Sequence, residues 1–171
     1  MGLFTSLQIR SLEDLLVHDL QDLYDAENRL CDALPKMAQA AHSPRLQQAF
    51  REHLDQTKHQ VSRLEDILRH LGQSVDGATC DAMVGLIKEA QDIIDADADP
   101  DVRDAGLIGC AQKVEHYEIA GYGTCRTFAD RLGFRDACDL LQQSLDEEGE
   151  TDKKLTSLAE GTINVQAQRK G

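Results

Sequence analysis

Four long stretches of this chain carry apolar residues at alternating steps of three and four, and acidic residues interrupt these stripes. That spacing places side chains on one face of an α-helix. In the first stretch the stripe runs through Leu20, Leu23, Glu27 and Leu30. Five acidic residues lie on or beside the stripes: Glu27, Glu115, Glu118, Glu148 and Asp152. An apolar interior strongly disfavours unpaired charge, so we expect a bound cation to hold these carboxylates together.

Apolar spacing and helix start signals predict five helices. The first begins at Ser11 as its cap, and Pro35 kinks it without ending it. Ser43 and Pro44 predict the start of the second helix, with the serine as cap. We expect a polar, frayed tail after Gly161. The expected long helices cover residues 11–41, 44–71, 100–132 and 135–159, and a short amphipathic helix covers 79–95.

Length and composition favour one all-α domain. With 171 residues, 4% aromatics and no tryptophan, the chain suits a helical protein better than a β-sandwich. We expect a single domain over residues 1–171, with its core at about 11–159 and a polar tail at 160–171. Two short turns and one long crossover that carries the short fifth helix describe a ferritin-like four-helix bundle.

Charge and cysteine content exclude several functions. The net charge is −13, so no basic surface is expected to bind nucleic acid or an anionic membrane. The five cysteines are scattered and odd in number, which predicts reduced thiols in a cytoplasmic protein. The first residues, Met1 to Ser6, lack the basic and apolar regions of a signal peptide, and no later run is long enough to span a membrane.

Polar residues recur at the middle of every long helix. Hard cations such as Fe(II) and Mn(II) prefer oxygen ligands, and bridging carboxylates can hold two ions together. Taken singly, Glu115 or Asp152 is more typical of a carboxylate at the rim with its head in water. His53 is more typical of a hydrogen-bonded core histidine than of a ligand, and His59 could be exposed. The coincidence at one level of four helices favours the metal site.

Four segments resemble the YciF/YciE-type ferritin-like proteins of bacteria. These segments are Asp22–Glu27, Phe50–Thr57, Gln112–Gly123 with its VEHYEIAGYG stretch, and Leu145–Asp152. The resemblance covers about residues 11–159. It implies a rubrerythrin-like helical fold, a homodimer, an association with stress responses and a metal centre. Residue by residue, it implies that Glu27, Glu115, Glu118 and Glu148 are metal ligands.

The sequence departs from rubrerythrin-type sites in two places. Those sites carry ExxH on the second and last helices, whereas here Gln56 precedes His59 and Glu148 is followed by Thr151 and Asp152. A glutamine in place of a glutamate would weaken one metal position, so a mononuclear or asymmetric site is consistent with the pattern. The predicted ligands are Glu27, His59, Glu115, Glu118, Glu148 and Asp152.

Two functions are therefore consistent with the sequence. The first is an iron- or manganese-binding protein of the bacterial stress response, in which Tyr24 and Tyr122 donate hydrogen bonds beside the ligands or act as core aromatics. The alternative is a non-enzymatic dimeric helical scaffold with a degenerate metal site. Whether the protein is an enzyme stays open.

Overall fold

The computed structural model describes residues 8–170, and it is helical throughout. The helices are α1 (Leu12–Ala40), α2 (Pro44–His70), α3 (Asp81–Asp95), α4 (Pro100–Leu132), α5 (Arg135–Leu158), the π-helix η1 (Ala159–Ile163) and α6 (Asn164–Gln168). The all-α prediction is confirmed, and each expected helix is present within about two residues of its predicted bounds. The expectation of a chain start without a signal peptide falls on residues 1–7, outside the described part.

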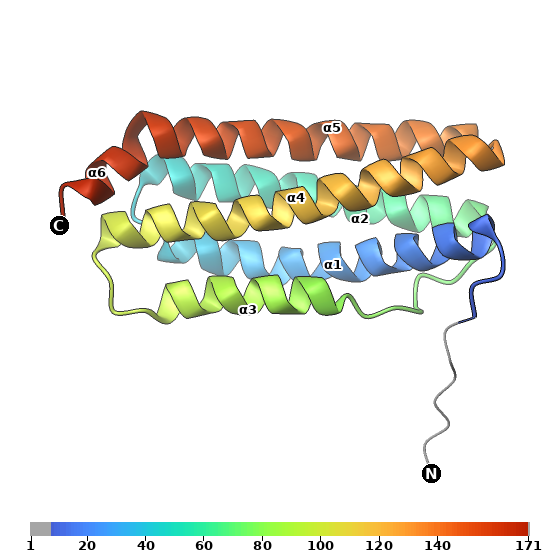
Figure 1. The fold of residues 1–171 in the computed structure, drawn as a ribbon, viewed down its shortest axis with the longest axis horizontal. Helices are drawn as coiled ribbons and strands as arrows, with labels where there is room; N and C mark the ends of the chain where they lie inside the picture. Colours follow the sequence, from blue (N-terminus) through green and yellow to red (C-terminus); the bar gives the residue numbers. More distant parts are fainter. Residues whose placement is uncertain (1–7, 171) are drawn as a thin grey trace, which may run out of the picture.

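The four long helices run side by side (Figure 1). Helix α1 packs against α2 and α4, while α5 packs against α4 and α2, so the four enclose a common interior. Helix α3 lies outside this group, against α1 and α4. Between residues 8 and 170, no helix is long and apolar enough to cross a membrane. All five cysteines are free thiols.

The start of α2 is capped from a distant part of the chain. At α1 the predicted cap forms, because the Asp14 amide donates to the Ser11 hydroxyl at 3.0 Å. Ser43 occupies the predicted N-cap position before Pro44, but its side chain makes no capping bond. Instead, the backbone amides of His42 and Ser43 each donate to the buried carboxylate of Asp104 on α4, at 2.7 Å. This carboxylate therefore fixes the α1–α2 turn to α4.

The C-terminal segment is ordered, contrary to the predicted frayed tail. Residues 159–163 continue α5 as a single π-helical turn, and α6 follows. Ile163 is only 2% exposed and belongs to the apolar cluster formed with Leu107, Ile108 and Leu155. Burial of one large aliphatic side chain, worth about 2 kcal/mol, explains why the segment packs back onto α4.

A polar layer divides the interior into two apolar clusters. One cluster includes Leu20, Leu23, Leu64, Tyr122 and Leu141, and the other includes Leu30, Phe50, Val114, Leu155 and Ile163. On every long helix the residues between these two sets are polar and buried: Glu27, His53, Thr57, Gln60, Glu115, Glu118, Ser144 and Glu148. The fold thus brings the interrupted parts of all four stripes to one level.

The Asp104 cap generates a stability prediction. Asp104→Ala leaves two partly buried amides without an acceptor, so it should lower the free energy of unfolding by about 3 kcal/mol. Urea denaturation followed by circular dichroism measures the change. The matched control, Asp130→Ala on an exposed part of α4, should cost about 0.5 kcal/mol or less. Equal costs for the two variants would contradict the assigned role of Asp104.

Candidate metal centre

Four of the five acidic residues that interrupt the stripes are fully buried. Glu27 on α1, Glu115 and Glu118 on α4, and Glu148 on α5 are each 0% exposed. A helix places residues three apart on neighbouring positions of one face, and for this reason Glu115 and Glu118 both reach the interior. The sequence therefore predicted correctly that these carboxyl groups turn into the core.

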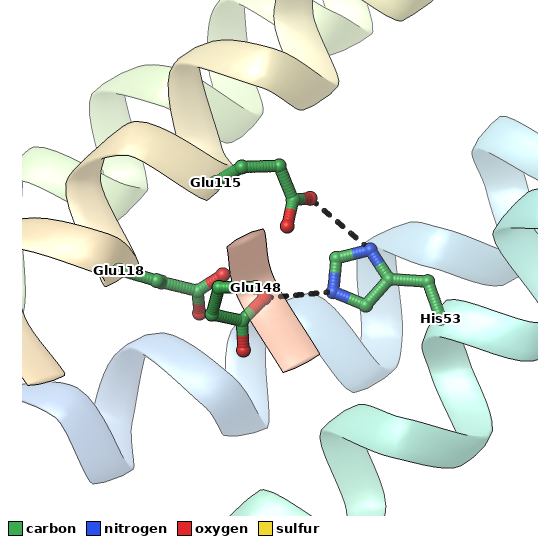
Figure 2. Close-up of side chains that lie close together, drawn as sticks. All are labelled: His53, Glu115, Glu118 and Glu148. Atoms are coloured by element: carbon green, nitrogen blue, oxygen red, sulfur yellow. Dashed lines mark ion pairs between the residues drawn. The ribbon is translucent and has the colours of Figure 1, made fainter. Parts of the chain in front are cut away.

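A histidine from α2 completes the group. Nδ1 of His53 lies 3.2 Å from Oε1 of Glu115, and Nε2 lies 3.8 Å from Oε2 of Glu148. Figure 2 shows the imidazole between these two carboxyl groups, with Glu118 beside Glu148. One potential ligand atom from each of His53, Glu115, Glu118 and Glu148 lies within 4.8 Å of all the others. This buried group could hold a metal ion.

Glu27 adjoins the group and is positioned by a tyrosine. The Tyr122 hydroxyl donates to Oε1 of Glu27 at 2.5 Å, and both residues are fully buried. The other oxygen of Glu27 has no hydrogen-bond partner within the described chain. Tyr122 thus has the predicted donor role, whereas Tyr24 donates to Glu65 at 2.9 Å and does not face Glu27.

A polar network reaches Glu148 from the α2–α5 interface. The Gln60 amide donates to Oε1 of Glu148 and, at 3.2 Å, to Oε2 of Glu147. Arg63 binds both oxygens of Glu147, at 2.6 and 2.7 Å, so its charge is committed to that carboxylate. The network orients one oxygen of Glu148 and leaves Oε2 unpaired on the side of His53.

Burial raises the pKa values of the clustered carboxyl groups. For Glu27 and Glu115 the main cause is desolvation, followed by the charge of Glu148. Desolvation also raises the pKa of Glu118 well above its usual value, and the charge of Glu27 adds to this. Burial raises the pKa of Glu148 from 4.5 to about 7. Without a cation, burial therefore favours the protonated form of each of these groups.

His53 is neutral at neutral pH, because burial lowers its pKa from 6.5 to about 4. Its two ring nitrogens have neighbours but no contact with hydrogen-bond geometry. A neutral imidazole has one lone pair that can bind a metal. The 3.8 Å separation from Glu148 is too long for a hydrogen bond and is compatible with two ligands of one ion.

The unpaired atoms match what a cation would need. As long as the carboxyl groups are ionised, these buried atoms lack hydrogen-bond partners: both oxygens of Glu115 and Glu118, Oε2 of Glu27, Oε2 of Glu148 and both nitrogens of His53. A proton between Glu27 and Glu118, or between Glu115 and Glu148, would pair some of the oxygens. Buried polar atoms without partners are rare in folded proteins, and a bound water or ion commonly satisfies those that occur. Several carboxylate oxygens and one imidazole form a donor set that fits divalent transition metals.

Two of the predicted ligands and Gln56 lie outside this group. His59 is exposed on the outer side of α2. Asp152 is 21% exposed, and it accepts a hydrogen bond from Gln112 at 3.0 Å and lies 3.6 Å from His116. Gln56 does not stand in a ligand position; its side-chain oxygen accepts a hydrogen bond from Thr151 at 3.3 Å.

His53 is the buried histidine of the cluster to which the sequence reasoning gave too little weight. The comparison with an ExxH pattern placed the histidine of α2 at position 59, whereas the helix turns residues 53, 57 and 60 inward. The apolar stripe already contained this signal, because His53 follows Phe50 by three residues and precedes Leu64 by eleven. Helical register was therefore a better guide than the spacing of a motif.

Comparison with known proteins gives close relatives of nearly full length. Protein YciF of Escherichia coli (strain K12) is 44% identical over 165 residues, which span 96% of this chain and 99% of YciF. The crystal structure of the E. coli stress protein YciF matches with a TM-score of 0.88, covering 91% of this chain and 99% of that one. A Xanthomonas campestris protein, 22% identical, matches with a TM-score of 0.75, covers 94% of this chain and 99% of its own, and shows the fold alone.

A further structure is described as "YcfI, a putative structural protein from Rhodopseudomonas palustris". It is 43% identical, has a TM-score of 0.86, and covers 90% of this chain and 98% of its own. A family model described as "Domain of unknown function (DUF892)" matches residues 11–168. This match and the identity to YciF show that the chain belongs to the DUF892 family, as the sequence resemblance predicted.

Proposed function

We propose that this protein binds iron or manganese at the centre of a ferritin-like four-helix bundle and acts in the bacterial stress response. The two hairpins α1–α2 and α4–α5, with α3 in the connection between them, support this fold. The observation that carries the proposal is the set of four fully buried glutamates around a neutral histidine, nearly all of whose polar atoms lack partners. The name of the E. coli relative supports the link to stress.

His53, Glu115, Glu118 and Glu148 would hold one ion, because their ligand atoms already lie close together. Glu27, adjacent to Glu118 and Glu148, would help to hold a second. Four carboxylates balance the charge of two divalent cations, while one cation would leave some groups protonated. Of the residues predicted from sequence, this set retains four glutamates. His53 takes the place of His59, and Asp152 acts only through its charge on Glu115.

The chemistry of this site would follow from its ligands. An iron or manganese ion held by carboxylates can exchange electrons with oxygen or peroxide. Tyr122 would hold Glu27 in position, and Gln60 would do the same for Glu148. The two apolar clusters on either side would exclude bulk water. We propose a protective role in which the protein sequesters the metal or consumes an oxidant with it.

A second candidate function is that of a dimeric helical scaffold without enzymatic activity. The description of the R. palustris relative as a structural protein favours it. The raised pKa values also favour it, since protonated carboxyl groups can remain buried without a metal. A homodimer and a cytoplasmic location are proposed under both functions, and five free thiols fit the reducing cytoplasm.

Metal content separates the two functions. After anaerobic loading with Fe(II) or Mn(II) and desalting, the folded protein should retain between about one and two ions per chain. Glu118→Gln/Glu148→Gln should retain almost none, as plasma mass spectrometry can measure. The matched control replaces the exposed Glu13 and Glu160 with glutamine and should bind as the wild type does. If the wild type retained no metal, the scaffold function would be the one that remains.

The choice of histidine can be tested directly. His53→Gln should weaken metal binding by at least about tenfold. Mutation of a residue that only hydrogen-bonds to a metal ligand can already reduce affinity by that factor. His59→Gln should bind normally, because His59 is exposed outside the group. Competition with a fluorescent chelator gives both affinities. A loss in the His59 variant with none in the His53 variant would restore the ligand set predicted from sequence.

Stability should depend on pH in opposite ways with and without metal. The glutamates have folded-state pKa values above 4.5, so the folded metal-free protein binds more protons than the unfolded chain. Its free energy of unfolding should therefore fall as the pH rises above about 4.5, and for Glu148 the fall should continue to about pH 7. The slope should be about 1.4 kcal/mol per pH unit for each proton that the folded protein binds in excess of the unfolded chain. His53 has the opposite effect on the free energy of unfolding between about pH 4 and pH 6.5, because its pKa is lowered to about 4 in the folded protein. It is a single group, whereas four glutamates act in the other direction.

The melting temperature in chelator should therefore be lower at about pH 8 than at about pH 5.5. With saturating Mn(II) the order should reverse, because acid protonates the ligands and releases the metal. Glu118→Gln/Glu148→Gln should weaken the dependence in chelator, since two titrating groups are gone. A metal-free melting temperature that rises over this range would contradict the proton-binding role of the cluster.

A further inference from the structure

We propose that divalent cations reach the buried site along the interface between α2 and α5, past a pair of neutral side chains, Gln56 and Thr151. This inference rests on the proposed metal-binding function. We call the interface the polar seam. Its members are Glu52, Gln56, Gln60 and Arg63 on α2, and Ser144, Glu147, Thr151 and Lys154 on α5.

The polar seam consists of successive polar pairs along two antiparallel helices. At one end Arg63 donates to Ser144 at 3.2 Å and to Glu147. Next, Gln60 bridges Glu147 and Glu148. One turn further, the Thr151 hydroxyl donates to Gln56 at 3.3 Å. Lys154 and Glu52 form an exposed ion pair at the other end.

A hollow opens at the exposed end of the polar seam. Its volume is about 180 Å³, enough for several water molecules. Glu52 and Glu150 supply negative charge to its wall, and Gln56 and Thr151 also line it. The buried Ala49 and Leu155 complete the wall with apolar surface. Thr151 follows the proposed ligand Glu148 by three residues, so less than one helical turn separates the hollow from the site.

Two further oxygen atoms of α2 are buried without partners. Thr57 is fully buried next to Gln56 in sequence, and its hydroxyl has no hydrogen-bond partner. Oε1 of Gln60, also fully buried, is unpaired as well. Neutral oxygens of this kind can replace water around a passing cation without binding it as firmly as a carboxylate would.

The α1–α4 interface on the opposite side of the site is closely packed at Leu23 and Gly121. On the α1–α4 side, Leu23 packs so closely on Gly121 that a Cβ there would lie 2.8 Å from the leucine Cδ2. The α4–α5 interface also carries polar residues, but the Gln112 amide is committed to Asp152 and Thr156 at 3.0 and 2.9 Å. At the α2–α5 interface, by contrast, the buried Oε1 of Gln60 has no hydrogen-bond partner within the described chain.

The rate of cobalt uptake tests this route. Stopped-flow absorption follows anaerobic binding of Co(II) to the full-length, chelator-treated protein, and equilibrium dialysis gives the stoichiometry. Gln56→Leu/Thr151→Val keeps the size of both side chains and removes their oxygens, so uptake should be about tenfold slower at unchanged stoichiometry. Lys154→Gln removes the positively charged lysine side chain from the wall of the hollow and should therefore speed cobalt uptake.

A matched control and a competing route complete the test. Gln142→Leu/Thr127→Val makes the same exchanges on α5 and α4 outside the polar seam and should leave the rate unchanged. Asp152→Asn probes the α4–α5 interface. Normal uptake in the seam variant, or slower uptake only in Asp152→Asn, would overturn the proposed route while the site itself stands. No equilibrium binding by the wild type would overturn the metal site and the route together.

Discussion

The burial of four carboxyl groups and a histidine in one apolar interior is the constraint on which the rest of the structure depends. Glu27, Glu115, Glu118 and Glu148 cannot all be ionised there without a compensating charge, because desolvation and mutual repulsion both oppose it. Protons or metal cations can supply that charge. The protonation of the site, its metal content and the stability of the fold are therefore linked quantities.

The helical scaffold accommodates this constraint by separating its polar layer from two apolar clusters. Leu20, Leu64 and Leu141 pack on one side of the layer, and Phe50, Val114 and Leu155 pack on the other. Apolar burial at both ends therefore stabilises the scaffold, and the charge state of the polar layer adds to or subtracts from that stability. Such an arrangement tolerates unpaired polar atoms that would be costly in a single small core.

Sequence patterns predicted the helices well, because each long helix contributes its own apolar stripe and ends at a local signal. They also predicted the burial of Glu27, Glu115, Glu118 and Glu148, since these residues lie on the stripes. They failed where the decisive contact is distant. The Asp104 cap acts on amides about sixty residues away, and the order of the C-terminal segment depends on the packing of Ile163. No local pattern encodes either contact.

The exposed position of His59 and the polar seam both follow from the register of α2. This helix turns His53, Thr57 and Gln60 inward, and only the first of these is a strong metal ligand. The other two are neutral, so they add no further negative charge to a cluster that already has four carboxylates. A fifth carboxylate at position 57 or 60 would bind a passing cation and raise the charge that must be balanced. The neutral face of α2 thus suits passage of an ion to the ligands, whereas α4, which carries two glutamates, suits its retention.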